Sequence, residues 1–184
     1  MAIRIFIIAL FILASPVYSF NSCNILPIEE EKLLSMSYDH FDQSENGWRT
    51  YAKLGCYHEI GVIIDEYLEQ HKMTLADWQV ISVAWHAGQM YAFNNEYQIA
   101  IRRFDHSLNS HEPKDSPILW NDYVYATIAF LDKDFPKLKL YRDKIARGPI
   151  FDGKKINLDI IDNLIRNFWQ PYSVAYQISN PPPT

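Results

Sequence analysis

The run from Trp85 to Gln89 places a histidine beside aromatic and amide side chains, a combination that could bind or activate a substrate. A histidine acts as a general base near neutral pH when it lies within hydrogen-bond reach of a substrate group. Such a base normally has a second side chain that orients it, and the residues around His86 do not identify one. We interpret His86 as a packed or surface histidine, with a catalytic role as the alternative.

A second group of titratable side chains is formed by Asp39, His40 and Asp42. Two carboxylates and an imidazole at this spacing could bind a metal ion or form an acid–base pair, although solvated clusters of this kind are common. The sequence contains no HExxH or GxSxG motif, no glycine-rich phosphate loop and no EF-hand loop. We therefore predict no metal site, no cofactor and no enzymatic activity.

The chain has two cysteines, Cys23 and Cys56. In an oxidising compartment an even number of cysteines predicts pairing, so we expect one disulfide between them. The alternative is a redox or metal-binding pair, which the absence of CxxC spacing disfavours. Closing a loop of about 30 residues stabilises a fold by roughly 3 to 4 kcal/mol.

The first 19 residues have the pattern of a secretory signal peptide. Arg4 precedes an apolar run at residues 5–14, and Val17-Tyr18-Ser19 ends the segment with a cleavage site expected after Ser19. The apolar run is well short of the roughly 20 residues that span a bilayer. We expect a periplasmic or secreted protein with no stable membrane anchor after cleavage; retention of the segment as an anchor is the alternative.

The composition indicates one helical domain and excludes one class of partner. The 184 residues include 48% apolar and 21% charged residues, with only 6 Gly, which disfavours disorder and a glycine-punctuated β fold. The 17 basic and 22 acidic residues give a net charge of -5. Nucleic-acid binding depends on Lys and Arg that neutralise phosphates, so we predict no nucleic-acid partner.

The elements that must position these side chains are helices, because apolar residues recur every three to four positions through most of the chain. The period is clear at residues 60–68, 78–92 and 97–108. A short helix is expected at 28–36, where a proline and three glutamates suit a helix start, and a last helix at 158–168.

Short breaks between these helices recur at a near-regular interval. Each break ends in an aromatic residue that opens the next helix, and these aromatics, Tyr57, Tyr97 and Phe135, are 40 and 38 residues apart. This spacing is typical of a solenoid of helix pairs, because one pair buries its apolar face only when neighbouring pairs stack on it.

The second of these units resembles a tetratricopeptide repeat. It contains Ala84-x-x-Ala87-Gly88-x-x-Tyr91 followed by Tyr97, Ala100 and Phe104, and small residues in that family let two helices approach closely. The resemblance covers about residues 47–147. The first and third units depart from the family pattern, with Trp48 where the family has Gly and Arg142 where it has an aromatic residue.

The resemblance implies an all-α fold, a short α-solenoid of about three helix-turn-helix units with a C-terminal capping helix. A helical bundle without repeats is the alternative. We expect a signal peptide at 1–19, an N-terminal segment with a short helix at 20–46, a tetratricopeptide-like domain at 47–172 and a proline-rich tail at 173–184.

In that family the first helix of each pair lines an inner groove. The resemblance places candidate binding residues there, which are Arg49, Trp85, Gln89, Phe93, Trp120, Tyr123 and Thr127, with Ala52, Lys53, Ser82 and Phe130 beside them. Aromatic anchors next to a few polar groups are typical of protein recognition, whereas packing of the same aromatics in the core is the alternative.

The sequence therefore predicts an exported, tetratricopeptide-like module that binds a protein or peptide through an aromatic inner groove. The alternative is a small-ligand-binding or hydrolytic all-α protein that uses His86 or the segment Asp39 to Asp42. An open groove with exposed aromatics would favour the first function, and a closed pocket with convergent polar groups the second.

Overall fold

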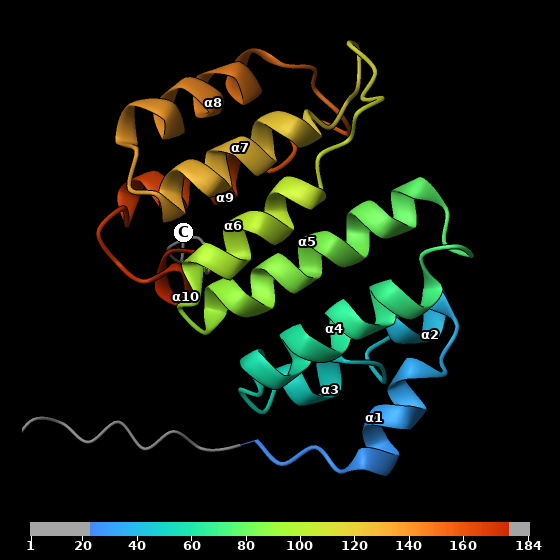
Figure 1. Cartoon of the computed structure of the whole chain (residues 1–184). Coiled ribbons are helices and arrows are strands. Elements are labelled where there is room, and N and C mark those ends of the chain that lie inside the picture. The colour runs from blue at the N-terminus through green and yellow to red at the C-terminus, as the bar shows by residue number, and fades with distance from the viewer. Residues whose placement is uncertain (1–22, 177–184) are drawn as a thin grey trace, which may run out of the picture.

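The computed structural model describes residues 23–176. Every regular secondary-structure element in that range is an α-helix (Figure 1). The expected signal peptide and residues 177–184 of the expected tail lie outside the described residues. The predicted all-α class is confirmed. In chain order the helices are α1 (Pro27–Leu34), α2 (Tyr38–Phe41), α3 (Arg49–Ala52), α4 (Tyr57–His71), α5 (Asp77–Phe93), α6 (Tyr97–His106), α7 (Trp120–Leu131), α8 (Phe135–Arg147), α9 (Leu158–Arg166) and α10 (Tyr172–Ala175).

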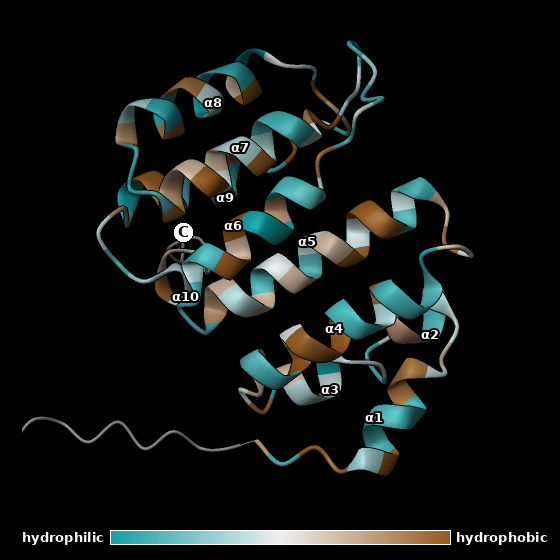
Figure 2. Cartoon of the chain, in the orientation of Figure 1, coloured by the Kyte–Doolittle hydropathy of each residue, from teal (hydrophilic) through white to brown (hydrophobic). Residues whose placement is uncertain are grey.

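Helices α4 to α8 lie side by side in chain order, each packed against the next (Figure 1). α1 and α3 pack against α4, α9 packs against α7 and α8, and α10 contacts α5 and α9. Hydrophilic and hydrophobic residues alternate along α6 and α8, as expected of helices with one apolar face (Figure 2). The short helix expected at 28–36 is α1, and the last expected helix is α9.

Two glycines allow the central helices to approach one another. A Cβ atom at Gly88 of α5 would lie 2.6 Å from the Cδ1 atom of Phe104 on α6, closer than a real Cβ contact. A Cβ atom at Gly61 of α4 would lie 3.0 Å from the ring of Tyr91 on α5. The absence of a side chain at these crossings therefore sets the spacing of α4, α5 and α6.

Helix α5 contributes to both apolar cores of the described residues. Val83 and Met90 pack with the N-terminal core, and Trp85 and Tyr91 pack with the C-terminal core. Most of α5 from Val83 to Ala92 is buried. A helix that is buried on both sides is apolar on more than one face, so α5 is the central element that positions its neighbours.

The segment before α3 is fastened to α4 by a disulfide and by side-chain contacts. Cys23 and Cys56 are bonded, with their Cα atoms 5.3 Å apart, which confirms the predicted disulfide. The ring of Phe41 stacks on that of Tyr67 at a centroid distance of 3.7 Å, and the Tyr67 hydroxyl donates to the Met36 carbonyl at 3.1 Å. These contacts hold α2 and the following turn against the helical layer.

The C-terminal part of the described chain folds back onto α5. Tyr172 is fully buried and its ring lies 5.2 Å from that of Phe93. Because α10 spans Tyr172–Ala175, helical structure continues past the boundary expected at residue 172. None of the helices within residues 23–176 has the length and apolar character needed to cross a membrane.

Candidate binding groove and the Asp42–His86 pair

An open groove with aromatic walls lies between α5, α7 and α9. We call it the aromatic groove; it has a volume of about 390 Å³ and is lined by Trp78, Ile81, Ser82, Trp85, His86, Trp120, Tyr123, Asn157, Ile160 and Tyr176. Three of the chain's five tryptophans belong to this lining. Apart from the histidine, no side chain that is charged near neutral pH lines the groove.

Trp85 forms the floor of the aromatic groove. Its side chain is almost fully buried, and its ring centroid lies 5.1 Å from that of Trp120, 4.8 Å from that of Tyr123 and 4.6 Å from that of Phe104. Offset and edge-on aromatic contacts of this kind are individually favourable and fix ring orientation. These contacts hold the floor of the groove rigidly in place.

Trp120 is fixed by hydrogen bonds at the start of α7. Its indole N–H donates to the Ser107 carbonyl at 2.6 Å, and the backbone N–H groups of Trp120 and Asn121 donate to the carboxylate of Glu112. A carboxylate at a helix N-terminus satisfies free N–H groups and is favoured by the helix dipole. The loop before α7 thus places this wall of the groove.

Trp78 is at the rim, in the first turn of α5. Its side chain is 62% exposed, and its ring meets the edge of Tyr38 at a centroid distance of 5.2 Å. Exposed tryptophans beside a cavity are typical energetic anchors of protein interfaces, since they bury a large area on binding. Trp78 is the groove residue that a partner can cover most completely.

Behind the groove wall, Asp42 and His86 form a hydrogen-bonded pair. The Nδ1 atom of His86 lies 2.8 Å from the Oδ1 atom of Asp42, which is fully buried. The same carboxylate accepts hydrogen bonds from Trp48 Nε1 at 3.2 Å, Gln43 Nε2 at 2.7 Å and Ser82 Oγ at 3.1 Å. Donors therefore surround Asp42, as a buried carboxylate requires.

The pKa of Asp42 is set by opposing effects. Burial raises the pKa, but hydrogen bonds from His86 and Trp48 and the positive charge of Arg49 outweigh it and hold the pKa below its ordinary value. Asp42 is thus an anion at neutral pH. Since Nδ1 of His86 donates to this anion, Nε2 is the ring nitrogen left for a ligand in the groove.

The other members of the predicted acidic cluster lie elsewhere. Asp39 and His40 are exposed, and His40 Nδ1 pairs with Ser37 Oγ at 2.9 Å. Only Asp42 of this cluster reaches the groove wall, where it supplies the orienting partner that the sequence around His86 did not reveal. Within residues 23–176, no three His, Cys, Asp or Glu side chains converge closely enough to hold a metal ion.

Three of the predicted binding residues, Trp85, Trp120 and Tyr123, line the aromatic groove. The Tyr123 hydroxyl is hydrogen-bonded to that of Tyr176 at 2.9 Å. Burial is the main effect that raises the pKa of both hydroxyls, so both stay neutral.

The other predicted binding residues lie behind the groove wall. Gln89 and Thr127 are buried, and the Thr127 hydroxyl donates to the Tyr123 carbonyl within α7. Phe93 packs against Tyr172 and Tyr176. Folding of α10 onto α5 thus covers part of the inner face that the repeat pattern suggested. Arg49 donates to the Asp42 carbonyl and lies 4.2 Å over the Trp48 ring, outside the groove lining.

Five groove residues were not among the predicted candidates, and these are Trp78, Ile81, Asn157, Ile160 and Tyr176. Trp78 lies two helical turns before Trp85 on the same face of α5, so helical periodicity could have identified it. Asn157, Ile160 and Tyr176 come from the C-terminal part of the chain, where the repeat pattern ends. No local signal in the sequence links them to α5.

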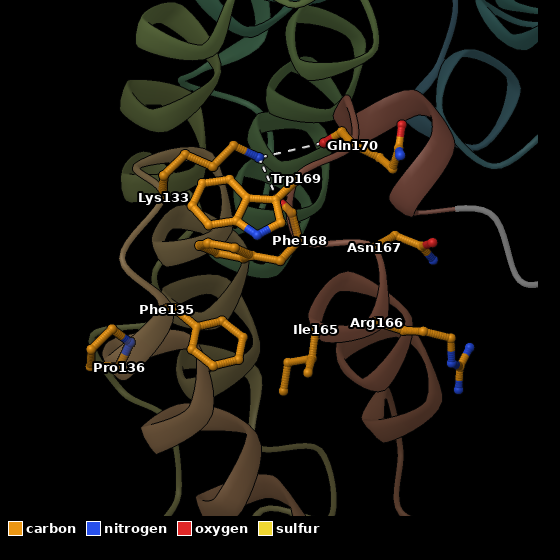
Figure 3. A pocket seen from close by; sticks show the side chains of 9 residues that line it. All are labelled: Lys133, Phe135, Pro136, Ile165, Arg166, Asn167, Phe168, Trp169 and Gln170. Carbon is orange, nitrogen blue, oxygen red and sulfur yellow. Dashed lines mark hydrogen bonds between the residues drawn. The ribbon is translucent and has the colours of Figure 1, made fainter.

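A larger cavity, the α8–α9 cavity, has a volume of about 610 Å³ and is lined by residues 133, 135, 136 and 165–170 (Figure 3). The Lys133 ammonium donates to the carbonyls of Phe168 and Gln170 and lies 4.0 Å from the centroid of the Phe130 ring. Phe135 and Ile165 face each other across it. Because its cation is bound to backbone carbonyls and no predicted site residue lines it, the aromatic groove is the better candidate site.

The chain matches no protein-family model, no curated protein and no solved structure.

Proposed function

We propose that the protein is a binding module that captures an extended segment of a protein or peptide in the aromatic groove. The observation that carries this proposal is the convergence of three tryptophans on one open groove, with Trp78 at the rim and Trp85 and Trp120 fixed below it. Interfaces are enriched in aromatic residues, and a few tryptophans commonly supply most of the binding energy.

The geometry of His86 suggests how a bound segment would be oriented. The hydrogen bond to Asp42 fixes the imidazole ring and leaves Nε2 beside the aromatic walls. A neutral ring would accept a backbone N–H through this atom, and a protonated ring would donate to a carbonyl. The side chains of Ser82 and Asn157 provide further polar contacts in the lining.

The helical arrangement supports a tetratricopeptide-like solenoid for this module. α5 with α6 and α7 with α8 are consecutive packed pairs, and the first helix of each contributes to the groove. The close approach of Phe104 to Gly88 agrees with small residues at the helix crossings of that family. α9 lies against the last pair as a capping helix would.

Export is part of the proposal. The Cys23–Cys56 disulfide is of the kind that persists in oxidising compartments, which supports a periplasmic or secreted location for a chain that begins with a signal-like sequence. We propose a protein or peptide partner in that compartment, and no nucleic-acid partner.

The test compares two tryptophans that are both exposed but lie at different sites. Trp78 is in the groove and Trp169 lines the α8–α9 cavity with 82% exposure. The tagged chain and its Trp78→Ala and Trp169→Ala variants are mixed with extract from the exported fraction, and the retained proteins are quantified by mass spectrometry. We expect Trp78→Ala to lose a partner by about tenfold or more, while Trp169→Ala retains it. Equal retention or equal loss in both folded variants would contradict the proposal.

The Asp42–His86 pair favours a second candidate function, hydrolysis with His86 as general base. A base held by a buried carboxylate is a feature of many hydrolytic sites, and Ser82 donates to Asp42, so the nucleophile would be water. Hydrolysis of p-nitrophenyl acetate and of a peptide mixture tests it. Loss of about hundredfold or more in the hydrolysis rate in His86→Gln, with helicity by circular dichroism unchanged, would establish this function.

A further inference from the structure

The last described residue of the chain belongs to the aromatic groove. Tyr176 lines the groove, and its hydroxyl is bonded to that of Tyr123. The sequence continues beyond it for eight residues, 177–184, so these residues are attached at the groove itself. For binding within the same molecule, the short link gives residues 177–184 a high effective concentration at the groove.

The composition of residues 177–184 matches the chemistry of the groove. The segment includes Pro181, Pro182 and Pro183 and has no charged side chain. The groove is lined mainly by aromatic residues, and no Asp, Glu, Lys or Arg side chain belongs to its lining. Proline-rich segments bind aromatic-lined grooves because the proline ring restricts the backbone before binding, which lowers the entropic cost.

The length of the segment after Tyr176 also suits the dimensions of the groove. Trp78 and Trp85 are seven residues apart on α5, which corresponds to about 10 Å along the helix axis. Pro181 follows Tyr176 by five residues, and five residues in a polyproline conformation span about 15 Å. In that conformation the three prolines lie from about 15 to about 22 Å of chain length beyond Tyr176, which exceeds the separation of these two groove tryptophans along α5.

We propose that the aromatic groove binds the chain's own proline-rich sequence, residues 177–184, in the same molecule. This inference rests on the proposed function of the groove and specifies it. The tail competes with an external partner, and the partner carries a proline-rich, uncharged segment of similar chemistry. Binding of a partner then requires displacement of the tail, which lowers the apparent affinity of the groove.

The test uses the full chain and the indole N–H signals of its five tryptophans in ¹H–¹⁵N spectra. A variant with Pro181→Ser, Pro182→Ser and Pro183→Ser is compared with the unchanged chain, after circular dichroism shows equal helicity. We expect the signals of Trp78, Trp85 and Trp120 to shift and the signal of Trp169, at the other cavity, to stay in place. A synthetic peptide of residues 177–184 added to the variant should move the three groove signals back, whereas the peptide with three serines should not.

Each other result overturns the proposal. Coincident groove signals in both chains, with no response to the peptide, would show that the tail does not occupy the groove. Groove signals that depend on protein concentration would assign the tail to a second copy. The experiment is independent of partner capture: if the groove tryptophan signals do not respond to the proline substitutions while Trp78→Ala still loses a partner, the proposed function stands and only this inference is wrong.

Discussion

The Nδ1 atom of His86 lies 2.8 Å from the Oδ1 atom of Asp42, so the turn after α2 holds a histidine of α5 in place. The two residues are 44 positions apart in the sequence. Their contact connects the N-terminal segment to the wall of the aromatic groove. It also gives His86 the oriented geometry that both candidate functions require.

The buried carboxylate predicts a pH-dependent contribution to stability. Because the folded-state pKa of Asp42 lies below its ordinary value of 3.8, the anion stabilises the fold above that value, and this contribution is lost as pH falls through the folded-state pKa. We expect Asp42→Asn to lower the free energy of unfolding by roughly 2 to 4 kcal/mol at pH 7, since several hydrogen bonds to a charged group are weakened.

Urea unfolding at pH 7 and at successively lower pH measures this effect. The difference between the unchanged chain and Asp42→Asn should shrink as pH falls below 3.8. Asp39→Asn, at an exposed position nearby, is the matched control and should change stability little at any pH. A constant difference over the whole range would show that the charge of Asp42 is not responsible.

The glycine at the α5–α6 crossing predicts a response opposite to helix propensity. In an exposed helix Gly→Ala stabilises by up to about 1 kcal/mol, but a Cβ at Gly88 would meet the Phe104 ring at 2.6 Å. We expect Gly88→Ala to destabilise the fold by about 1 to 3 kcal/mol through overpacking. Gly61→Ala, with a Cβ 3.0 Å from the Tyr91 ring, should cost less. Thermal unfolding would refute this order if Gly88→Ala were the more stable variant.

The disulfide predicts a loss of stability on reduction. It joins residues 33 positions apart, and a loop of that size is worth roughly 3 to 4 kcal/mol in the chain-entropy model. A Cys23→Ser and Cys56→Ser double variant should therefore have a lower urea midpoint than the oxidised chain. The same midpoint should be reached by the unchanged chain in reductant. Identical midpoints for the oxidised and reduced chains would show that the disulfide does not stabilise the fold.

The tyrosine pair at the groove predicts unequal effects of two similar substitutions. The hydroxyl of Tyr176 is bonded to that of Tyr123 at 2.9 Å, and the Gln89 side chain acts to lower the pKa of Tyr176 against the effect of burial. Tyr176→Phe leaves the hydroxyl of Tyr123, the more deeply buried residue, without this partner and should cost about 1 to 3 kcal/mol, whereas Tyr123→Phe leaves the less buried Tyr176 hydroxyl and should cost less. Chemical denaturation of both variants checks the order, and a larger loss in Tyr123→Phe would contradict it.

Much of the fold could be predicted from local sequence signals. The 3.6-residue period predicted helices at α4, α5, α6 and α9, and the cysteine count predicted the disulfide. The helices follow from the pattern of neighbouring residues, and the disulfide follows because the chain has only two cysteines that can pair. The repeat spacing also identified Trp85, Trp120 and Tyr123, because equivalent positions of α5 and α7 face the same side.

The rest of the candidate site depends on contacts distant in sequence. His86 and Asp42 lie in different segments, and nothing in either segment indicates that they meet. Gln89 and Thr127 occupy positions equivalent to groove residues but are buried, with α10 packed on α5 beside them. Tyr176, which directly follows α10, lines the groove because α10 packs on α5. The position of α10 follows from tertiary packing, which a repeat pattern does not encode.

A partner bound in the aromatic groove lies within crosslinking reach of the groove lining. Site-specific photocrosslinking in cells detects this contact, with p-benzoylphenylalanine at position 81 in the groove and, as the control, at position 165 in the α8–α9 cavity. We expect a crosslinked product with another protein from position 81 and none from position 165. A product from position 165 alone, or none from position 81, would contradict it.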